Sequence, residues 1–406
     1  MNGYILKGRV IDGYGGEPAE RGVVMVEGDK ITCVCAENEF RKDADLPVIE
    51  IDGGTILPGF IDCHTHLTSL GMKPEAHYTR PKYDSLLEAV SDAKKMLHAG
   101  FTSAREMGEF GPYIKRAVAK GFIAGPKLFV GCKMLSGSSG HGDIAAYLDR
   151  DYAQRNNIAS YMVDGVDECL KGVRMQFREG AEFIKICTTG GVMSSGDEVD
   201  SSEFSVGEIR AMVEEAEQHN TYVASHSIGN LGIRRALESG VKCIEHGIFL
   251  DEYCVELMVK NDCTLCPTLT IVNCILENPQ DVPPYAYRKA LIASEGHARS
   301  LQMAHKAGVR IVFGTDFLGG DSKASAFGTQ GREFVSLVEC GLSPMEAIMS
   351  TTRNAAHVIR KTDELGVLES GKTADIVVVN GNPLEDISCL AEPDNIKIVM
   401  QNGEIV

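Results

Sequence analysis

The stretch Pro58-Gly-Phe-Ile-Asp-Cys-His-Thr-His66 decides how this sequence is interpreted. It closes an apolar, β-branched run that begins at Thr55, and such a run predicts a buried strand. Because residues i and i+2 of a strand point to the same face, His64 and His66 project side by side where the strand ends. Two such imidazoles can hold a divalent metal. A lone His-x-His pair is a common chance pattern, so the interpretation depends on further ligands elsewhere in the chain.

The composition argues against several classes of partner. The 406 residues, of which 44% are hydrophobic, suffice for one large domain with a sizeable core and a smaller module. The net charge of −17, from 40 basic and 57 acidic residues, argues against nucleic acid and anionic membrane surfaces. No apolar run has the length needed to span a bilayer. The sequence leaves the oligomeric state open, a homo-oligomer included.

The cysteines and the first residues indicate the compartment. The start, MNGYILKGRVIDG, has neither the charged leader nor the apolar core of an export signal. The 13 cysteines are odd in number and scattered, and several lie in apolar runs, where a free thiol behaves as a small hydrophobe. Cys263-x-x-Cys266 lacks the second pair that a zinc site of this kind needs. We expect a reducing, cytoplasmic setting.

The middle of the chain alternates apolar runs of strand length with segments of helical period. Eight strand candidates are Gly59–His66, Thr102–Gly108, Lys127–Gly131, Phe183–Thr189, Thr221–Ser227, Val241–Gly247, Thr264–Leu269 and Arg310–Asp316. Most are followed by a helix candidate, namely Ser85–His98, Val206–His219, Ile233–Ser239, Asp251–Lys260 and Pro344–Met349. Eight such repeats predict an α/β fold, a closed (β/α)8 TIM barrel. A doubly wound open sheet would need a Gly-rich phosphate turn after the first strand, where His-Thr-His stands instead.

Both ends of the chain are rich in short β-strand candidates separated by Gly-Asp and Gly-Gly turns. We expect the two ends to pair into one small β-sandwich domain. Residues 1–57 and 361–406 would then form this domain, and residues 58–360 the barrel.

Further polar residues fall on the other strand candidates. His226 ends the run Tyr222-Val-Ala-Ser-His, His246 ends Cys243-Ile-Glu-His, and Asp316 ends the last strand. Lys185 lies in the middle of Phe183-Ile-Lys-Ile-Cys. In a barrel these positions converge on the C-terminal mouth, where barrel enzymes place their sites. Together with the first two histidines they form a set of candidate ligands for two metal ions.

Lys185 is the odd member of this set, because an ammonium has no lone pair for a metal. A neutral amine can react with carbon dioxide to give a carbamate, and that anion could bridge two metals roughly 3.5 to 4 Å apart.

The histidines in helix-period segments are expected to be surface, helix-terminal or structural residues: His98, His219, His297, His305 and His357.

The chain resembles the amidohydrolase superfamily over essentially its whole length, on the motifs PGFIDCHTH, FIKICTTGG, VASHS, IEHG and FGTDF. Its loops 134–143 and 188–194 resemble the subgroup of metal-dependent prolidases, Xaa-Arg/Lys dipeptidases and imidazolonepropionase. The resemblance implies two metal ions, zinc first among the candidates, bridged by carboxylated Lys185. It assigns one ion to His64, His66 and Asp316, and the other to His226 and His246.

The resemblance also implies the reaction, hydrolysis of a C–N bond in a small-molecule amide. Asp316 is expected to accept the proton of the attacking water and to pass it to the leaving nitrogen. His141, in the Gly/Ser-rich loop after the third strand candidate, is expected to donate a hydrogen bond that polarises the scissile carbonyl. A non-catalytic metal-binding scaffold is the alternative. Asp316 argues against it, because a structural zinc site is closed and has no use for an additional base.

The sequence departs from the dipeptidases of the subgroup at Ile228, two residues after the fifth-strand histidine, where they carry a tyrosine that holds the substrate carboxylate. Isoleucine cannot donate a hydrogen bond, and an unpaired carboxylate there would cost roughly 1 to 3 kcal/mol. Basic candidates near the mouth are Lys133 and Arg105, and Arg105 is expected to pair with Glu106 or a neighbour. Dipeptide-like or N-acyl amino acid substrates are expected first. The alternative is a cyclic amide, or a xenobiotic amide, carbamate or urea.

Overall fold

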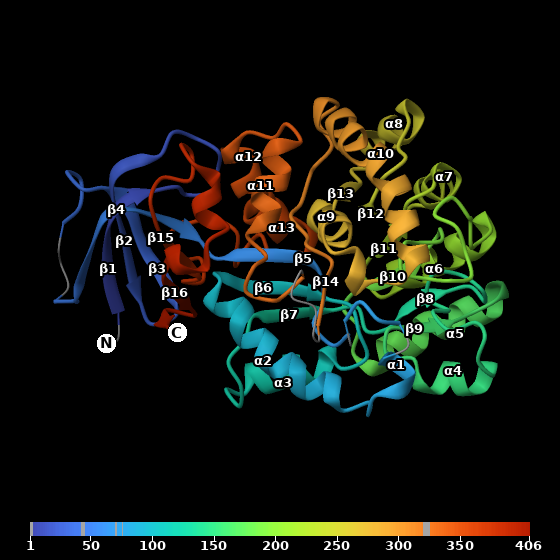
Figure 1. Cartoon of the computed structure of the whole chain (residues 1–406). Helices are drawn as coiled ribbons and strands as arrows, with labels where there is room; N and C mark the ends of the chain where they lie inside the picture. The colour runs from blue at the N-terminus through green and yellow to red at the C-terminus, as the bar shows by residue number, and fades with distance from the viewer. Residues whose placement is uncertain (1–2, 42–44, 70, 75, 320–324) are drawn as a thin grey trace.

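The computed structural model describes residues 3–41, 45–69, 71–74, 76–319 and 325–406. Its strands form three sheets. Figure 1 shows one sheet at the left, where both termini lie, and the two other sheets at the right among the helices. The molecule therefore has a β-rich end and a larger α/β part.

Strands from both ends of the chain share the first sheet. Its seven strands, in the order β17-β16-β15-β4-β1-β2-β3, are Glu404–Ile405, Ile396–Gln401, Ile376–Asn380, Val48–Pro58, Gly3–Val10, Ala19–Glu27 and Lys30–Ala36. The ends are joined where β15 pairs antiparallel with β4, with Val378 opposite Ile56. Both side chains are fully buried, so the pairing is held by a shared apolar core as well as by the ladder.

The other two sheets are parallel. The first has four strands in the order β14-β5-β6-β7: Phe317–Leu318, Phe60–His66, Phe101–Glu106 and Lys127–Val130. The second has six in the order β13-β12-β11-β10-β8-β9: Thr264–Cys266, Cys243–His246, Val223–Ser227, Ile184–Cys187, Met134–Ser136 and Ser160–Met162. Nearly every residue of these strands is buried, as parallel strands covered by helices require.

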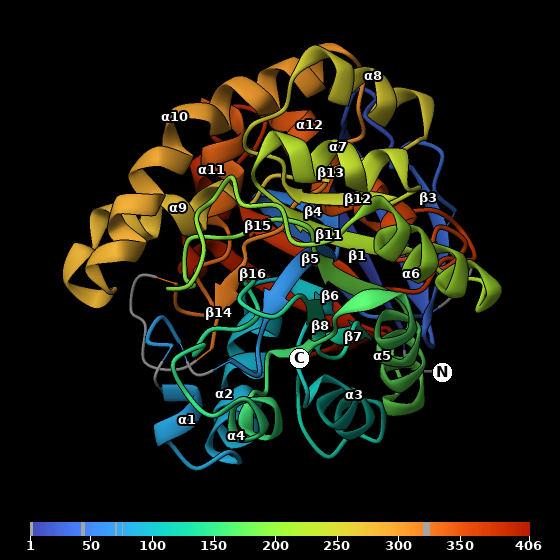
Figure 2. The same ribbon diagram turned by 90° about the vertical axis from the view of Figure 1, so that its right-hand side faces the viewer.

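Helices cover the parallel strands on the outside, as Figure 2 shows in the view along the molecule. The helices are α1 Ala76–Thr79, α2 Asp84–His98, α3 Gly111–Ala119, α4 Arg150–Asn156, α5 Gly165–Glu179, α6 Val206–Gln218, α7 Asn230–Glu238, α8 Glu252–Lys260, α9 Leu269–Glu277, α10 Pro284–Lys306, α11 Arg332–Glu339, α12 Pro344–Thr351 and α13 Arg353–Val358. Short 3₁₀ helices span Pro279–Asp281, Ile387–Leu390 and Pro393–Asn395. None of the helices in the described ranges is both long enough and apolar enough to cross a bilayer.

Local sequence explains where several helices begin. α6 starts at a capping box, in which the Ser205 side chain accepts from the backbone of Glu208 and Glu208 reaches back to the Ser205 backbone. Its buried residues follow at helical spacing, from Ile209 through Met212 and Val213 to Ala216. This face packs in the same core as the parallel strands, which holds β10 and β11 in place beneath it.

The α/β fold with parallel strands is confirmed, but its details differ from the expected ring of eight strands. The described parallel strands form two sheets. Two of these strands, β8 and β9, were not expected. Residues 310–316 make one isolated bridge, Ile311 with Leu265, before the two-residue strand β14. The backbone of Asp316 has a left-handed φ of 55°, which a regular strand cannot accommodate. The sandwich is not confirmed either, because the described residues of the two ends lie in one sheet.

Candidate active site

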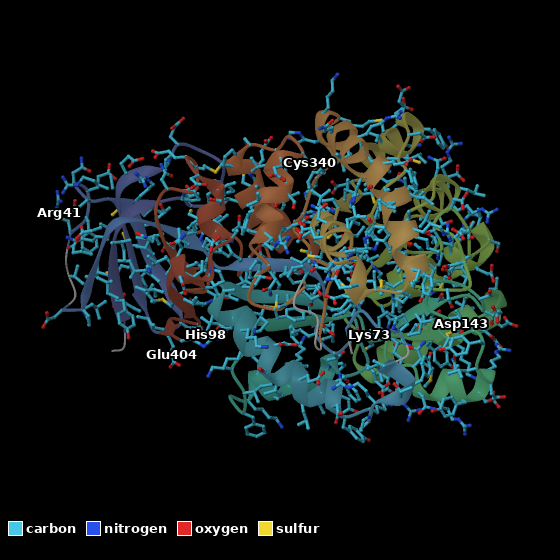
Figure 3. The ribbon with its side chains drawn as sticks, viewed as in Figure 1. Arg41, Lys73, His98, Asp143, Cys340 and Glu404 are labelled. Carbon is cyan, nitrogen blue, oxygen red and sulfur yellow. The ribbon has the colours of Figure 1, made fainter. Side chains whose placement is uncertain are left out.

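Side chains from separate strands meet at the carboxyl ends of the parallel strands. This end of the molecule lies away from the seven-stranded sheet: Figure 3 places Lys73 and Asp143 on that side, opposite Arg41 and Glu404. β5 ends in His64 and His66, and Asp316 directly precedes β14, which pairs with β5. The backbone N–H of Asp316 donates to the carbonyl of His64 at 2.8 Å, so the two chain segments are tied together at the site.

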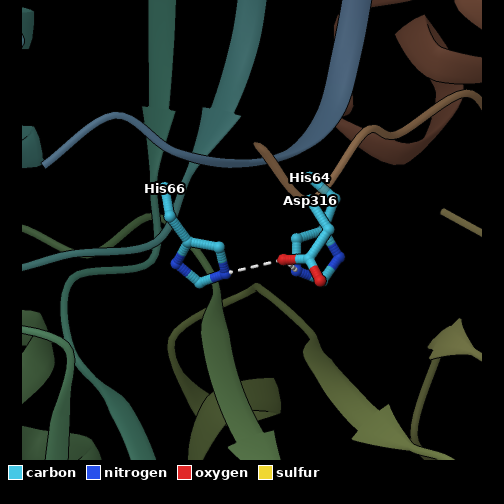
Figure 4. A group of neighbouring side chains, drawn as sticks. All are labelled: His64, His66 and Asp316. Atoms are coloured by element: carbon cyan, nitrogen blue, oxygen red, sulfur yellow. Dashed lines mark ion pairs between the residues drawn. The ribbon is translucent and has the colours of Figure 1, made fainter. Parts of the chain in front are cut away.

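Three of the predicted ligands are in direct contact. Oδ1 of Asp316 lies 3.2 Å from Nε2 of His64 and 3.2 Å from Nε2 of His66. Figure 4 shows the three side chains converging on one point. Their ligand atoms all lie within 4.8 Å of one another, which is close enough for a single cation to contact all three.

The two other predicted histidines continue this cluster. The ring of His246, at the end of β12, lies 5.2 Å from that of His64 between centroids, and the ring of His226, in β11, lies 4.6 Å from that of His246. The four imidazoles therefore form a continuous row, from His66 through His64 and His246 to His226.

A second set of hydrogen bonds fixes which ring nitrogen faces inward. Nδ1 of His66 donates to the carbonyl of Met107 at 2.8 Å, and Nδ1 of His246 lies 2.7 Å from Oγ1 of Thr268. In His226 the pattern is reversed, since its Nε2 donates to the carbonyl of Gly190 at 3.1 Å. Such outer partners orient histidines that bind metals. They leave Nε2 of His66 and His246, and Nδ1 of His226, to act as ligands.

Lys185 reaches the same region from β10 and is 1% exposed. Its Nζ has no hydrogen-bond partner among the described residues. After burial, its charge is one of the causes that lower the pKa of His226 and of His246. A buried ammonium without a partner is rare because its desolvation is not offset.

Burial tunes the protonation of the site. It lowers the pKa of His226 and of His246 well below the usual value of 6.5, which keeps both rings in the neutral form that binds metals. Burial alone would raise the pKa of Asp316, but the neighbouring His64 and His66 hold it well below its usual range. The site thus combines the neutral imidazoles of His226 and His246 with an ionised carboxylate, and against the effect of burial this carboxylate raises the pKa of His66.

Two of the predicted ligands have strained backbones. His246 has a φ of 69° and Asp316 a φ of 55°, in the left-handed region that residues with a Cβ seldom occupy. Each such conformation costs on the order of 1 to 3 kcal/mol and persists where the surrounding structure requires it, commonly at functional sites. The strain places both side chains at the mouth, and no sequence pattern predicts it.

His141 lies beside this row, in the loop after β8. Its ring stacks on that of His226 with 4.1 Å between centroids and 13° between planes. Glu203 fixes the backbone of the loop by accepting from the N–H of His141 at 2.7 Å and from Oγ of Ser136 at 2.7 Å. Burial raises the pKa of Glu203 to about 8 and lowers that of His141 to about 4, so the imidazole is neutral at physiological pH.

Sequence reasoning missed the partners that lie behind these residues. Glu245, which precedes His246 in β12, accepts from Nδ1 of His64 at 2.7 Å and pairs with Arg105 at 2.6 Å. Arg105 is therefore paired across the fold, and not with Glu106. Glu245 and His246 are adjacent in the sequence, yet both side chains reach His64, because the left-handed backbone of His246 interrupts the alternation of the strand. Strand periodicity therefore gave no signal for this contact.

Two further expectations are corrected. Lys133 is not free to bind a substrate anion, because its Nζ pairs with Glu109 at 2.9 Å. His297 is not a surface residue: it is buried on α10, where its Nε2 donates to the carbonyl of Pro267 at 2.6 Å. The 23-residue α10 packs one face against the core, and this face mixes apolar and polar side chains, so the helical period alone did not reveal which polar side chains are covered.

The candidate ligands border a cavity whose remaining wall is mostly aliphatic. His66, His226, His246, Asp316 and His141 line one side. The apolar lining consists chiefly of Met72, Met134, Ile144, Val192, Met193, Ile228, Ile248, Ile271, Val272, Ile275 and Leu318. Among the described residues that line this cavity there is no lysine or arginine. The cavity therefore suits a substrate with a sizeable apolar group.

The chain is similar to known proteins over its whole length. The ochratoxinase of Aspergillus niger is 30% identical across 99% of this chain and 86% of its own length. Its crystal structure has a TM-score of 0.90 at 28% identity and covers 100% of this chain and 95% of that one. A prolidase crystallised with N-methylphosphonate-L-proline has a TM-score of 0.91 at 33% identity, over 100% and 99% of the two chains. The imidazolonepropionase of Shouchella clausii is 22% identical over 95% of this chain and 86% of its own length.

The match to a family covers the same region as the site. Residues 55–406, which include every candidate ligand, match the model of the amidohydrolase family. The family agrees with the cluster of imidazoles and the carboxylate at the strand ends. This chain therefore belongs to the amidohydrolase family and is a hydrolase that acts on amide bonds.

Proposed function

We propose that this chain is a binuclear zinc amidohydrolase in which Lys185 is carboxylated on its side-chain nitrogen. The observation that carries the proposal is the unpartnered Nζ of Lys185, buried close to a row of imidazoles. As an ammonium, this group has a desolvation cost that no hydrogen bond offsets. As a carbamate the same nitrogen carries oxygen atoms that two cations can share, and the lysine then has a physical reason to be there.

The donor set fits two divalent ions, which amidohydrolases generally use. His64, His66 and Asp316 would hold one ion, His226 and His246 the other, with carboxylated Lys185 between them. Nitrogen and oxygen donors in this mixture suit zinc. When bound, the two ions would make hydroxide available near neutral pH and would polarise the scissile carbonyl.

The protein's own groups supply the proton transfers and the positioning. Asp316 is ionised and touches two of the candidate ligands, so it can take the proton of the attacking water and hand it to the leaving nitrogen. His141 lies on the wall of the same cavity and would contact the substrate. The aliphatic wall would exclude bulk water around the reacting bond.

We also propose that the two parallel sheets together make a closed (β/α)8 barrel. Backbone hydrogen bonds across the seam support this: the N–H of Leu265 donates to Arg310 at 3.0 Å, and the N–H of Cys63 donates to Phe313 at 2.9 Å. The barrel domain would span residues 58–360, and residues 1–57 and 361–406 would form the second domain.

All thirteen cysteines are free thiols, which supports a reducing cytoplasm as the setting.

We propose N-acyl amino acid or dipeptide-like substrates, and the aliphatic wall of the cavity supports those with a large apolar group over small polar ones. Each buried methylene contributes about 0.8 kcal/mol, or roughly a fourfold gain in kcat/KM. A cyclic amide, as in the imidazolonepropionase that the chain resembles, is the second candidate, followed by xenobiotic amides, carbamates and ureas. A screen of the zinc-loaded protein against acyl-chain series in these classes ranks them directly.

Metal analysis combined with chemical rescue tests the role of Lys185. We expect about two zinc ions per wild-type chain and a loss of bound zinc in Lys185→Ala. Acetate, which can occupy the space and offer two oxygens, should restore both metal and activity, whereas ethylamine should not. Two tightly held zinc ions in Lys185→Met without any added carboxylate would refute the bridge.

A further inference from the structure

His141 is tied to a buried chain of polar side chains that runs away from the cavity. Nδ1 of His141 lies 3.0 Å from Oγ of Ser194, and the same Oγ lies 2.5 Å from Oδ1 of Asp197. Asp197 pairs in turn with Nζ of Lys289 at 2.6 Å, and the side chains of this ion pair are only 3% and 2% exposed. Residues from a loop and from α10 thus converge behind one imidazole.

Lys289 fixes the geometry of this chain of contacts. Besides Asp197, its Nζ donates to the carbonyls of Gly191 and Ser194, each at 2.8 Å. The three acceptors hold the 191–197 segment in one shape. A Cβ on Gly191 would lie 2.3 Å from Nδ1 of His141, so the segment packs directly against the ring, which is also stacked on that of His226.

Counting protons sets the direction of each hydrogen bond. A serine hydroxyl has one proton, and a carboxylate paired with a lysine has none to give. The other near neighbour of Oγ of Ser194 is the carbonyl of Gly191 at 3.3 Å, which also can only accept. The Ser194 proton therefore points to Asp197 or Gly191, and towards His141 the hydroxyl acts as an acceptor. Nδ1 of His141 must then carry the proton that closes this contact.

We infer that Ser194 and Asp197 are positioning residues that keep the His141 proton on Nδ1, so that Nε2 presents its lone pair to a hydrogen-bond donor of the substrate. The inference rests on the proposed function for the identity of that substrate. It changes the role expected from the sequence, because a neutral ring in this tautomer accepts a hydrogen bond at Nε2 and does not donate one to the scissile carbonyl. The natural donor in a secondary amide is the N–H of the bond to be cleaved.

The tautomer can be observed without any assay of activity. In the zinc-loaded protein labelled with ¹⁵N-histidine, two-bond ¹H–¹⁵N correlations distinguish a protonated from an unprotonated ring nitrogen, and His141→Gln assigns the signal. We expect a protonated Nδ1 and a bare Nε2 in wild type, and a shift towards a protonated Nε2 in Ser194→Ala and Asp197→Asn. A bare Nδ1 in wild type would overturn the inference, as would an unchanged signal in both variants.

Matched variants separate positioning from general damage to the loop. Ser138→Ala removes the hydrogen bond from the Ser138 hydroxyl to the carboxylate of Asp164. This bond does not involve His141, so the variant should leave the His141 signals as in wild type. Ser194→Thr, which keeps the hydroxyl, should restore the wild-type tautomer. With an amide that the protein hydrolyses, Ser194→Ala should lower kcat about 10- to 100-fold at unchanged zinc content, and Ser194→Thr should recover most of it. Equal kcat values for the alanine and wild-type proteins would refute the role in catalysis, whereas absence of any amide hydrolysis in wild type would refute the proposed function and leave the tautomer result standing.

Discussion

The carboxylate of Glu245 lies 2.7 Å from Nδ1 of His64 and holds that imidazole from behind. The other oxygen of Glu245 is 2.6 Å from Arg105, and all three side chains are almost completely buried. Burial alone would raise the pKa of Glu245, but Arg105 and the other nearby cations keep it well below its usual range. A fixed negative charge thus orients His64 and makes its Nε2 a better ligand.

Glu245→Gln should weaken metal binding and also destabilise the fold. Loss of the charge behind His64 is expected to reduce zinc affinity about 10- to 100-fold, the usual range for an outer partner of a metal-binding histidine. Competition with a chelator measures it. The variant also leaves the buried Arg105 without an anionic partner, so the unfolding free energy of the protein should fall by roughly 3 to 5 kcal/mol. The double variant Arg105→Met with Glu245→Gln should recover stability but not zinc affinity; recovery of both would show that the charge has no part in metal binding.

Lys185→Met should stabilise the metal-free protein. The buried amine has no hydrogen-bond partner in the described part of the chain, so replacing it with an apolar side chain of similar length removes a desolvation cost of about 1 to 3 kcal/mol. Thermal unfolding in the presence of chelator measures the change. Lys289→Met is the matched control, because Lys289 is equally buried but has three acceptors. It should destabilise by roughly 3 to 5 kcal/mol, and a loss of stability in both variants would mean that Lys185 is already satisfied without metal.

Ile228→Tyr should shift the preference of the enzyme towards substrates with a free carboxylate. Ile228 is 2% exposed and lines the cavity, at the position where the resembling dipeptidases hold that group with a hydroxyl. A new donor to a carboxylate is worth about 1 to 3 kcal/mol, or 5- to 150-fold in the ratio of kcat/KM for a dipeptide over its C-terminal amide. Ile228→Phe supplies the same bulk without the hydroxyl. Identical ratios for the tyrosine and phenylalanine variants would exclude a carboxylate contact at this place.

Glu203 should make the stability of the His141 loop depend on pH. Burial raises the pKa of Glu203 to about 8 from an ordinary value of 4.5, despite the hydrogen bonds that it accepts. The native state therefore keeps a proton that the unfolded chain has lost, and the stability that this proton contributes is complete below pH 4.5 and is lost as pH rises through 8. Wild type should lose on the order of a few kcal/mol between pH 5 and 8.5 through this residue.

The matched comparison for this pH dependence is Glu203→Gln, which cannot titrate. Its unfolding free energy should fall less steeply over the same pH interval, even if the amide makes it less stable at pH 5. Glu392→Gln, at an exposed position, serves as the control and should keep the slope of wild type. Parallel curves for Glu203→Gln and wild type would show that the carboxyl is already ionised in the native protein at pH 5.

The sequence by itself determined the α/β class and the positions of His64, His66, His226, His246 and Asp316. These follow from local rules: a strand alternates its faces, and parallel strands of successive repeats end on one side of the fold. Each candidate ligand could therefore be found within its own short apolar run. Lys185 was found as the residue that did not fit, and its unpartnered nitrogen agrees with that.

Only the tertiary structure decided which hydrogen-bond and ion-pair partners hold the side chains of the site in place. Glu245 meets His64 across 181 positions of the sequence, and Lys289 meets Asp197 across 92, so no local pattern joins them. The left-handed backbones of His246 and Asp316 are likewise held by contacts made elsewhere in the fold. Periodicity specifies which face a side chain takes, whereas its hydrogen-bond partner depends on which distant segment is packed against that face, and this is fixed only when the whole core is assembled.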